Sequence, residues 1–394
     1  MNLSKPPFPL AARVRRVSPS ATLALNQKAQ QMRARGEDVV ALTAGEPDAP
    51  TPAHVVEALA RAARAGETRY TAVPGIPEVR DAVAERYREH GVHADRVILT
   101  AGGKQAIFNA LLCLLEDGDQ VLGFAPYWLS YRDMVALCGG EFVALPTDSS
   151  FLPQPEVLER AIGPQTRMVV LNSPSNPTGA VIPEGRMRAL TEVLRRHSHV
   201  VLLFDEIYDR LVYPNARFVS PLEVAPDLLD RTVLVNGGSK TYAMTGLRAG
   251  WAVAHPGLIE SMSKVQGQST SHCSAPVQRA LQAALQGDQS FVETMRTTLN
   301  RRRKALFEGL KHIPGVHCPE PLGAFYAFPS LGPKAVGESG QPDSAAVCQR
   351  LLDNQKLVVV PGEPFGAPGY VRLSFAVADD ILAEALTRLK EGLA

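Results

Sequence analysis

The chain has 394 residues, with 41 Lys+Arg against 40 Asp+Glu, so its formal net charge is +1 with His neutral. This balance argues against a protein that binds nucleic acid by neutralising phosphates, because such proteins carry clustered excess basic charge. Hydrophobic residues make up 45% and charged residues 21% of the chain, which excludes a disordered polypeptide. Single hydrophobic cores stop growing at roughly 250–300 residues, so the length predicts two lobes.

The cysteines and the apolar segments indicate the cellular compartment. Five cysteines are dispersed without a C-x-x-C pair, as in a cytoplasmic protein whose thiols stay reduced. The N-terminus lacks the apolar core of a secretory signal, and no apolar stretch approaches the ~20 residues of a membrane span. We therefore expect a cytoplasmic protein without a membrane partner. The histidines show no metal-ligand spacing, so no metal is expected either.

Short apolar strands alternate with helical patterns through the middle of the chain, which predicts a parallel sheet covered by helices. The strands are nearly continuous in apolar residues, and this implies burial on both faces of the sheet. The expected strands are residues 96–100, 120–124, 168–171, 200–204, 232–235 and 249–254. A helix is expected after residue 76, because apolar residues recur there at helical spacing until Gly91.

The C-terminal part of the chain predicts a second, smaller α/β unit. A long helical pattern from Gln289 to about His312 leaves the central lobe. Strands are expected at 323–326, 357–361 and 370–375, with helices near 345–354 and at the C-terminus. The Pro- and Arg-rich N-terminal segment is expected to pack on this unit. The predicted division is residues 1–47 as that segment, 48–290 as the large cofactor-binding domain and 291–394 as the small domain.

Polar, glycine-containing segments follow several strands, at the edge where open α/β sheets bind ligands. Thr100–Ala106 (TAGGKQA) combines two glycines with a helix start, which suits a phosphate, although a plain turn would carry the same residues. Asn176 precedes a proline in the segment NSPSNPTG, and this favours extended backbone there. Asp205 follows VVLLF directly and needs a cationic partner or several donors, unless it only caps a helix.

Three basic residues complete the candidate site. Lys240 lies in a small-residue turn after a strand, where a lysine can lose its proton and act as a nucleophile. Arg248 is available for a phosphate or a carboxylate, and Arg372 interrupts an apolar strand, where it needs an anion. Taken singly, each basic residue is more often a solvated surface charge. Together with Asp205 and the glycine turn they predict a site for pyridoxal 5′-phosphate.

These motifs resemble those of the class I pyridoxal-phosphate aminotransferases, and in particular the bacterial aspartate aminotransferases with their prephenate-aminotransferase relatives. The resemblance covers nearly the whole chain through PSAT (19–22), LTAGEPD (42–48), YTAVPGIPE (70–78), GGKQA, PYW (126–128), NPTGA, DEIY, SKTYAMTGLRAG and VRLS. It implies the α/β fold type I, with a three-layer α/β/α large domain around a mostly parallel sheet and a smaller α/β domain.

The resemblance also implies roles around the cofactor ring. Lys240 would bind the cofactor covalently and later move the proton between the two carbon atoms that exchange it. Asp205 would pair with the ring nitrogen, while Asn176 and Tyr208 would hydrogen-bond the ring oxygen. Trp128 would stack on the ring, although a large aromatic residue can also simply fill the core.

Further roles follow for the cofactor phosphate. The amides of Gly103 and Lys104 would bind it, together with Ser239 and Arg248. Tyr70 would reach the phosphate of a neighbouring subunit, so the resemblance implies a homodimer with shared active sites.

For the substrate, the resemblance assigns the α-carboxylate to Arg372, with Gly45, Trp128 and Asn176 nearby. Lys104 would bind a second carboxylate, helped by the hydroxyls of Ser20 and Thr22. Against this role, a lysine at a helix start can also point into solvent.

The predicted reaction moves the amino group of L-aspartate, or another dicarboxylic amino acid, to 2-oxoglutarate by a ping-pong mechanism, giving oxaloacetate and L-glutamate. Prephenate is a second candidate acceptor. Aminotransferases of aromatic or other neutral amino acids, C–S β-lyases and aminocyclopropane-carboxylate synthases share the same lysine, aspartate and arginine, so these alternatives stay open. A DNA-binding regulator is disfavoured, because only about 40 residues precede the first motifs.

Overall fold

A seven-stranded sheet forms the centre of the computed structural model, which describes residues 8–17, 19, 21–337 and 340–394. The strand order is β2-β8-β7-β6-β5-β3-β4. Strand β8 runs antiparallel to β2 and β7, whereas the other neighbouring pairs are parallel. The strands are β2 (Val97–Thr100), β3 (Gln120–Ala125), β4 (Glu141–Pro146), β5 (Thr166–Asn172), β6 (Val201–Asp205), β7 (Thr232–Gly237) and β8 (Gly250–Val253). The predicted mostly parallel sheet is confirmed.

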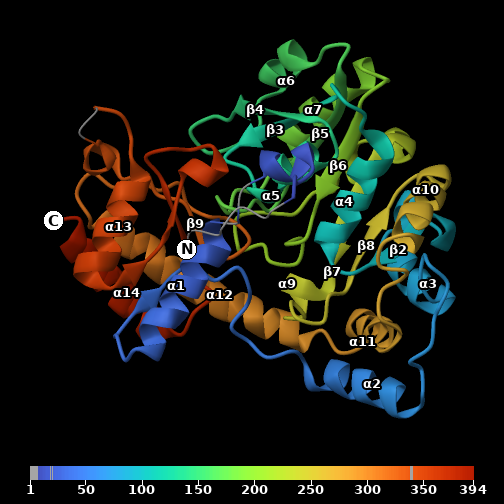
Figure 1. Ribbon diagram of the computed structural model, residues 1–394, viewed down its shortest axis with the longest axis horizontal. Helices are drawn as coiled ribbons and strands as arrows, with labels where there is room; N and C mark the ends of the chain where they lie inside the picture. Colours follow the sequence, from blue (N-terminus) through green and yellow to red (C-terminus); the bar gives the residue numbers. More distant parts are fainter. Residues whose placement is uncertain (1–7, 18, 20, 338–339) are drawn as a thin grey trace.

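Helices cover both faces of this sheet (Figure 1). They are α3 (Pro77–Glu85), α4 (Gly103–Leu114), α5 (Ser130–Leu137), α6 (Pro155–Ala161), α7 (Glu184–Arg196), α10 (Pro256–Gly267) and α11 (Ala275–Gln286), and α2 (Ala53–Arg64) packs on α11. Successive side chains of a strand point to opposite faces. In β6, Leu202 and Phe204 pack in one core with α3, α7 and α11, whereas Leu203 packs in the other with α4, α5 and α10. The three-layer α/β/α arrangement is therefore confirmed.

A further core surrounds the C-terminal helices α12 (Ser290–Lys311), α13 (Ser344–Gln355) and α14 (Asp379–Gly392). Two small sheets belong to it, one pairing β1 (Val40–Ala41) with β10 (Leu357–Val358) and one ordering β11 (Val360–Pro361), β12 (Val371–Ser374) and β9 (Tyr326–Ala327). Val40 and Leu42 lie inside this core, so the chain after α1 (Ala21–Ala34) packs here. The proposed domain boundaries themselves stay a prediction.

Within the described residues, the short elements are the helices α8 (Pro221–Val224) and α9 (Gly238–Thr241) and six 3₁₀ turns. The turns are η1 (Ala12–Arg16), η2 (Arg88–His90), η3 (Ala94–Arg96), η4 (Pro226–Arg231), η5 (Gly332–Ala335) and η6 (Glu363–Phe365). Gly91 ends η2 with a φ of 74°, a left-handed conformation that glycine adopts without strain, as expected for a stop signal.

Several strand predictions were wrong in their details. The expected strand 357–361 is divided, because β10 pairs with β1 whereas β11 pairs with β12, and the chain turns from one partner to the other at Val359. The strand expected at 323–326 begins only at Tyr326. Edge strand β4 was missed, since its polar first residue and its partly exposed side chains lack the continuous apolar pattern of a central strand.

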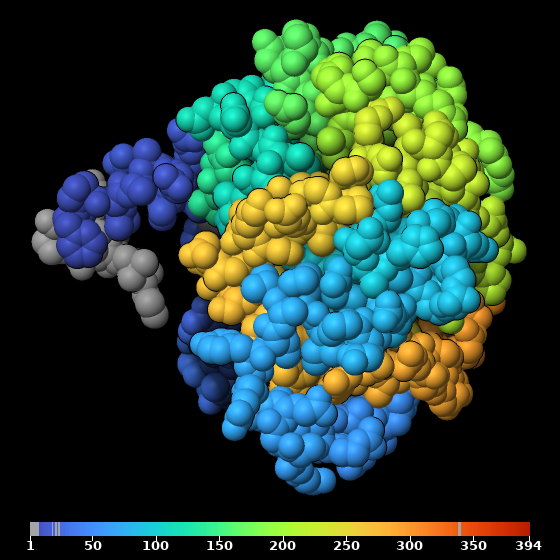
Figure 2. All heavy atoms as spheres, turned by 90° about the vertical axis from the view of Figure 1, so that its right-hand side faces the viewer, coloured from blue at the N-terminus to red at the C-terminus, as the bar shows by residue number. Residues whose placement is uncertain are grey.

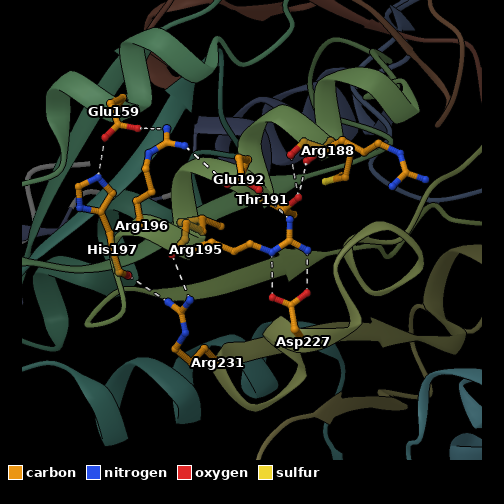
Figure 3. Close-up of polar contacts among 11 residues, drawn as sticks. Glu159, Arg188, Thr191, Glu192, Arg195, Arg196, His197, Asp227 and Arg231 are labelled. Atoms are coloured by element: carbon orange, nitrogen blue, oxygen red, sulfur yellow. Dashed lines mark hydrogen bonds and ion pairs between the residues drawn. The ribbon is translucent and has the colours of Figure 1, made fainter.

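Charged side chains hold the C-terminal end of α7 (Figure 3). Nη1 of Arg231 donates to the carbonyls of His197 and Val200 at 3.0 and 2.9 Å, and Nη2 donates to the carbonyl of Leu194 at 3.1 Å. Carbonyls at a helix end have no intrahelical donor. One guanidinium on η4 therefore binds two acceptors at the end of the helix, Leu194 and His197, and a third, Val200, directly before β6.

Membrane spans and metal clusters were sought in the described part of the chain. None of its helices combines the length and the apolar character that crossing a bilayer requires. Its His, Cys, Asp and Glu side chains form no group of three or more that could hold a metal ion. The five cysteines are free thiols.

Replacing Arg231 by Met should lower the free energy of unfolding by about 2 kcal/mol, because bonds between a charged donor and part-buried carbonyls are lost. Urea denaturation of the purified protein measures this change. Arg188→Met is the control, since its exposed i,i+4 pair with Glu184 is worth only about 0.5 kcal/mol. Equal losses in the two variants would contradict the capping role of Arg231.

Candidate active site

A cavity of about 240 Å³ lies where the strands of the large sheet end. Its lining residues come from the ends of β5, β6 and β7, from the helix start after β2, from the turn after β3, and from β9 and the segment after β1. They are Gly45, Gly103, Lys104, Ile107, Trp128, Asn172, Asn176, Asp205, Ile207, Tyr208, Ser239, Lys240, Arg248 and Tyr326. The structure thus brings most of the predicted site residues together, although Tyr70 and Arg372 do not line the cavity.

Lys240 projects from α9, the short helical turn that follows β7. The turn needs glycine before it, because a Cβ at Gly237 would lie 2.7 Å from the carbonyl oxygen of Ala249. Nζ of Lys240 donates to the carbonyl of Gly45 at 2.5 Å. Burial lowers the pKa of Lys240 to about 8; neighbouring arginines act in the same direction and nearby carboxylates oppose them. The amine therefore loses its proton far more readily than an ordinary lysine does.

Asp205 is the last residue of β6, and only 5% of it is exposed. The Tyr131 hydroxyl donates to Oδ2 at 2.7 Å, and the amide of Ile207 donates to Oδ1 at 3.2 Å. Burial raises the pKa of Asp205 to about 6, while these hydrogen bonds and the charge of Lys240 oppose that rise. A turn rather than an α-helix follows the strand, so Asp205 is no helix cap.

Arg372 lies on β12 and is 2% exposed. Its guanidinium carbon lies 4.6 Å from the ring centre of Tyr326 and 5.3 Å from that of Phe365. Nη1 donates to Oδ1 of Asn176 at 3.1 Å and Nη2 to the carbonyl of Thr43 at 3.0 Å, whereas buried Nε has no partner in the described structure. A buried guanidinium bonded only to neutral acceptors favours an anion beside it.

The N-terminus of α4 forms one corner of the cavity, together with Arg248. Gly102 precedes it with a φ of 85°, and a Cβ there would lie 2.5 Å from Nη2 of Arg248. The positive φ favours glycine at this position, and without a Cβ the guanidinium can lie close to the backbone. Gly103 opens the helix and Ser239 lines the same cavity, so helix amides, a hydroxyl and a cation face one place.

The family model for aminotransferase class I and II matches residues 37–389 of the chain. The chain belongs to this family. An aspartate/prephenate aminotransferase of Cereibacter sphaeroides is 43% identical over 384 residues, which cover 95% of this chain and 96% of that protein.

Solved structures give the same result for the fold. The aspartate aminotransferase of Rhizobium meliloti matches with a TM-score of 0.93 and 41% identity, covering 98% of this chain and 99% of that one. The aspartate aminotransferase of Thermus thermophilus with maleate matches with a TM-score of 0.92 and 42% identity, covering 98% and 100%. The fold is type I, and the protein is a pyridoxal-phosphate-dependent aminotransferase. The predicted family, fold and enzyme class are confirmed.

The side chains of the aminotransferase cavity fit pyridoxal 5′-phosphate. A buried amine of lowered pKa and a buried carboxylate, Lys240 and Asp205, line one cavity, as an aldehyde and a protonated ring nitrogen require. The α4 N-terminus and Arg248 supply donors for a phosphate. The unpartnered Nε of Arg372 is a further donor next to Asn176.

Lys104 forms the side of the cavity near α5. Its Nζ donates to Oγ of Ser130 at 3.1 Å and lies 4.9 Å from the ring centre of Trp128. Burial lowers the pKa of Lys104, and the charge of Arg248 lowers it further. The lysine therefore lines the cavity, while the residue as a whole stays exposed to solvent. Of the two predicted hydroxyls, Thr22 has a buried Oγ1 without a partner in the described structure, whereas Ser20 lies outside the described residues.

Two tyrosines of the aminotransferase site were missed from the sequence. Tyr131 follows Trp128 by three residues, one helical turn, so this spacing could have indicated it. Tyr326 lines the cavity and its hydroxyl lies 3.1 Å from that of Tyr208. No sequence signal singles out Tyr326, because the second core carries it into the site.

Asp205→Asn should stabilise the protein freed of its cofactor. The native pKa of Asp205, about 6, exceeds the ordinary 3.8, so the folded protein binds this proton more tightly than the unfolded chain does. The stability that protonated Asp205 contributes is therefore fully present below about pH 4 and is lost as the pH rises through 6. At pH 7 the variant should therefore gain about 3 kcal/mol, and the gain should vanish in acid. Urea denaturation between pH 4 and 8 measures it. Exposed Asp380→Asn should change little at any pH; a destabilised Asp205→Asn protein at pH 7 would contradict the burial argument.

Proposed function

We propose that this aminotransferase transfers the amino group of L-aspartate, or of another dicarboxylic amino acid, to 2-oxoglutarate, giving oxaloacetate and L-glutamate. The observation that carries this proposal is the presence of two separate cations. Lys104 lines the cavity, and Arg372 donates a hydrogen bond to Asn176, which also lines it. A dicarboxylate needs one cation for each end. The names of the relatives support this reading, as does the Thermus structure with maleate, which is a dicarboxylate.

Pyridoxal phosphate, when bound, supplies an aldehyde that condenses with amines and a ring that takes up the electron pair released at the substrate α-carbon. Nζ of Lys240 would bind the aldehyde and, once released, take the proton from the α-carbon, for which a lowered pKa prepares it. Asp205 would hold the proton on the ring nitrogen, and Tyr131 keeps that carboxylate ionised by donating to Oδ2.

The remaining contacts orient the cofactor. The amides of Gly103 and Lys104, with Ser239 and Arg248, would bind its phosphate at the α4 N-terminus. Asn176 and Tyr208 would hydrogen-bond the ring oxygen. Trp128 would stack on the ring, a role supported by its place in the cavity wall.

Arg372 would bind the α-carboxylate of either substrate in turn. The rings of Tyr326 and Phe365 hold its guanidinium, so its donors are fixed in direction before the substrate arrives. A prefixed fork loses little entropy when it forms two parallel bonds with a carboxylate. Gly45, whose carbonyl accepts from Lys240, leaves room for the substrate beside the lysine.

We also propose a homodimer with shared sites, in which Tyr70 reaches the phosphate site of the partner. Tyr70 is 88% exposed, and the N-terminal stretch around η1 projects from the body with Phe8, Leu10 and Val14 exposed (Figure 2). Exposed apolar groups of this kind mark protein contacts. The cytoplasm is the proposed compartment, which the five free thiols support.

The half-reaction tests the proposed function. The cofactor-loaded protein given L-aspartate alone should release one equivalent of oxaloacetate per site and then stop until 2-oxoglutarate is added. Coupled assay of oxaloacetate measures this stoichiometry, and replacing 2-oxoglutarate by prephenate tests the second acceptor. Continuous release of pyruvate or ammonia would replace the proposal by a β-lyase.

Lys104→Met should raise the KM for aspartate by about 10- to 100-fold, because a charge-assisted bond to the distal carboxylate is lost. The KM for an apolar amino acid should stay nearly constant, since that substrate has no distal carboxylate. Steady-state kinetics with both donors measure the two values. Lys264→Met, at an exposed pair with Glu260, is the matched control. Equal KM increases for both donors would show that Lys104 does not read the side chain.

A further inference from the structure

The irregular segment Tyr70–Ile76, between α2 and α3, is held by buried side chains from a distant part of the chain. Nε2 of Gln266 donates to the carbonyl of Val73 at 3.0 Å. Oε1 of Gln278 accepts from the amide of Ile76 at 2.7 Å. Both glutamines are 0% exposed. Buried amides thus replace the regular hydrogen bonds that this segment lacks.

His272 holds the other end of the segment. Its Nε2 lies 3.4 Å from the amide nitrogen of Thr71, and its Nδ1 lies 2.8 Å from the carbonyl oxygen of Cys273. An amide can only donate and a carbonyl can only accept, so Nε2 is the acceptor and Nδ1 the donor in these two contacts. The same ring meets that of Tyr70 edge-on, with 5.6 Å between the centroids. His272 therefore contacts Tyr70 through its ring and Thr71 through its acceptor nitrogen.

The segment that these contacts hold carries Tyr70, whose side chain does not belong to the cavity of its own subunit. Tyr70 is 88% exposed and is absent from the lining of the cavity. In Figure 2 the light-blue chain that includes this segment lies at the surface. Burying polar groups is costly unless each finds a partner, and an exposed tyrosine returns little stability to its own chain. A backbone held in this way would keep Tyr70 in a fixed position, as is needed if its side chain enters a second copy of the chain.

We propose that His272 is a positioning residue that acts in trans: it fixes the Thr71 amide and the Tyr70 ring so that Tyr70 enters the phosphate site of a second copy of this chain. The inference rests on the dimer proposed above. His272 does not line the cavity of its own chain, so its effect on that cavity is indirect.

The first test measures the cofactor dissociation constant of the cofactor-free dimer by absorbance titration with pyridoxal phosphate. His272→Phe keeps a ring beside Tyr70 but removes both hydrogen bonds, and it should weaken binding about tenfold. Tyr70→Phe should weaken binding by a similar factor, and the double variant no further, because both changes remove one contact. His272→Gln restores an acceptor for Thr71 and should recover most of the affinity.

His199→Phe is the matched control, since this exposed imidazole also bonds a backbone carbonyl, that of Gly163. It should leave the dissociation constant unchanged. Additive losses in the double variant, or an equal loss in the His199 control, would overturn the proposal.

The second test uses hybrid dimers that combine a Lys240→Ala subunit with a His272→Phe subunit, purified through two different tags. The site that retains Lys240 then receives Tyr70 from the subunit with intact His272. Borohydride labelling of Lys240 at increasing cofactor concentration should show wild-type affinity at this site.

The outcomes separate the two proposals. If the labelled site of the hybrid dimer still binds the cofactor about tenfold more weakly than the wild-type site does, His272 acts within its own subunit, and this would overturn the inference. A monomer in sedimentation velocity would instead overturn the dimer itself and with it the trans role.

Discussion

The burial of two opposite charges at the ends of neighbouring strands governs this structure. Asp205 and Lys240 lie at the ends of β6 and β7, which pair in parallel, so the chain direction of the sheet brings them to the same edge. Burial raises the pKa of the acid to about 6 and lowers that of the amine to about 8. Both pKa values therefore lie close to neutral pH, where protons can be exchanged. Burying the two charged groups lowers the stability of the fold, and a bound cofactor can offset this loss.

The active site lies between two hydrophobic cores, and each of them contributes polar groups to it. The large sheet contributes the lysine and the acid, whereas the second core contributes Arg372 and Tyr326. The bond from Arg372 to Asn176 joins the two parts, and Tyr208, which follows β6, packs in the second core with its hydroxyl 3.1 Å from that of Tyr326. A substrate carboxylate bound by Arg372 would thus lie next to Asn176, which is proposed to contact the cofactor ring.

Much of the fold was predictable because buried parallel strands leave a clear apolar pattern. The central strands β2, β3, β5, β6, β7 and β8 were located within a few residues, and α12 was expected at its observed place. The apolar pattern was insufficient where the pairing of strands decides the boundaries of a strand. The run 357–361 is uniformly apolar, yet it divides between two sheets because β1 and β12 approach it from different directions. Edge strand β4 carries too little apolar pattern to be recognised.

The amino-acid sequence predicted that Lys240, Asp205 and Asn176 lie together, since they follow strands whose ends must meet at one edge, and all three line the same cavity. It was also sufficient for the family, because the motifs occur in order along nearly the whole chain. The groups that hold these residues in place became apparent only in the folded chain. Tyr131 contacts Asp205 and Tyr326 contacts Tyr208, although these partners lie far apart in the sequence. Such contacts depend on packing between cores and loops, which no local pattern encodes.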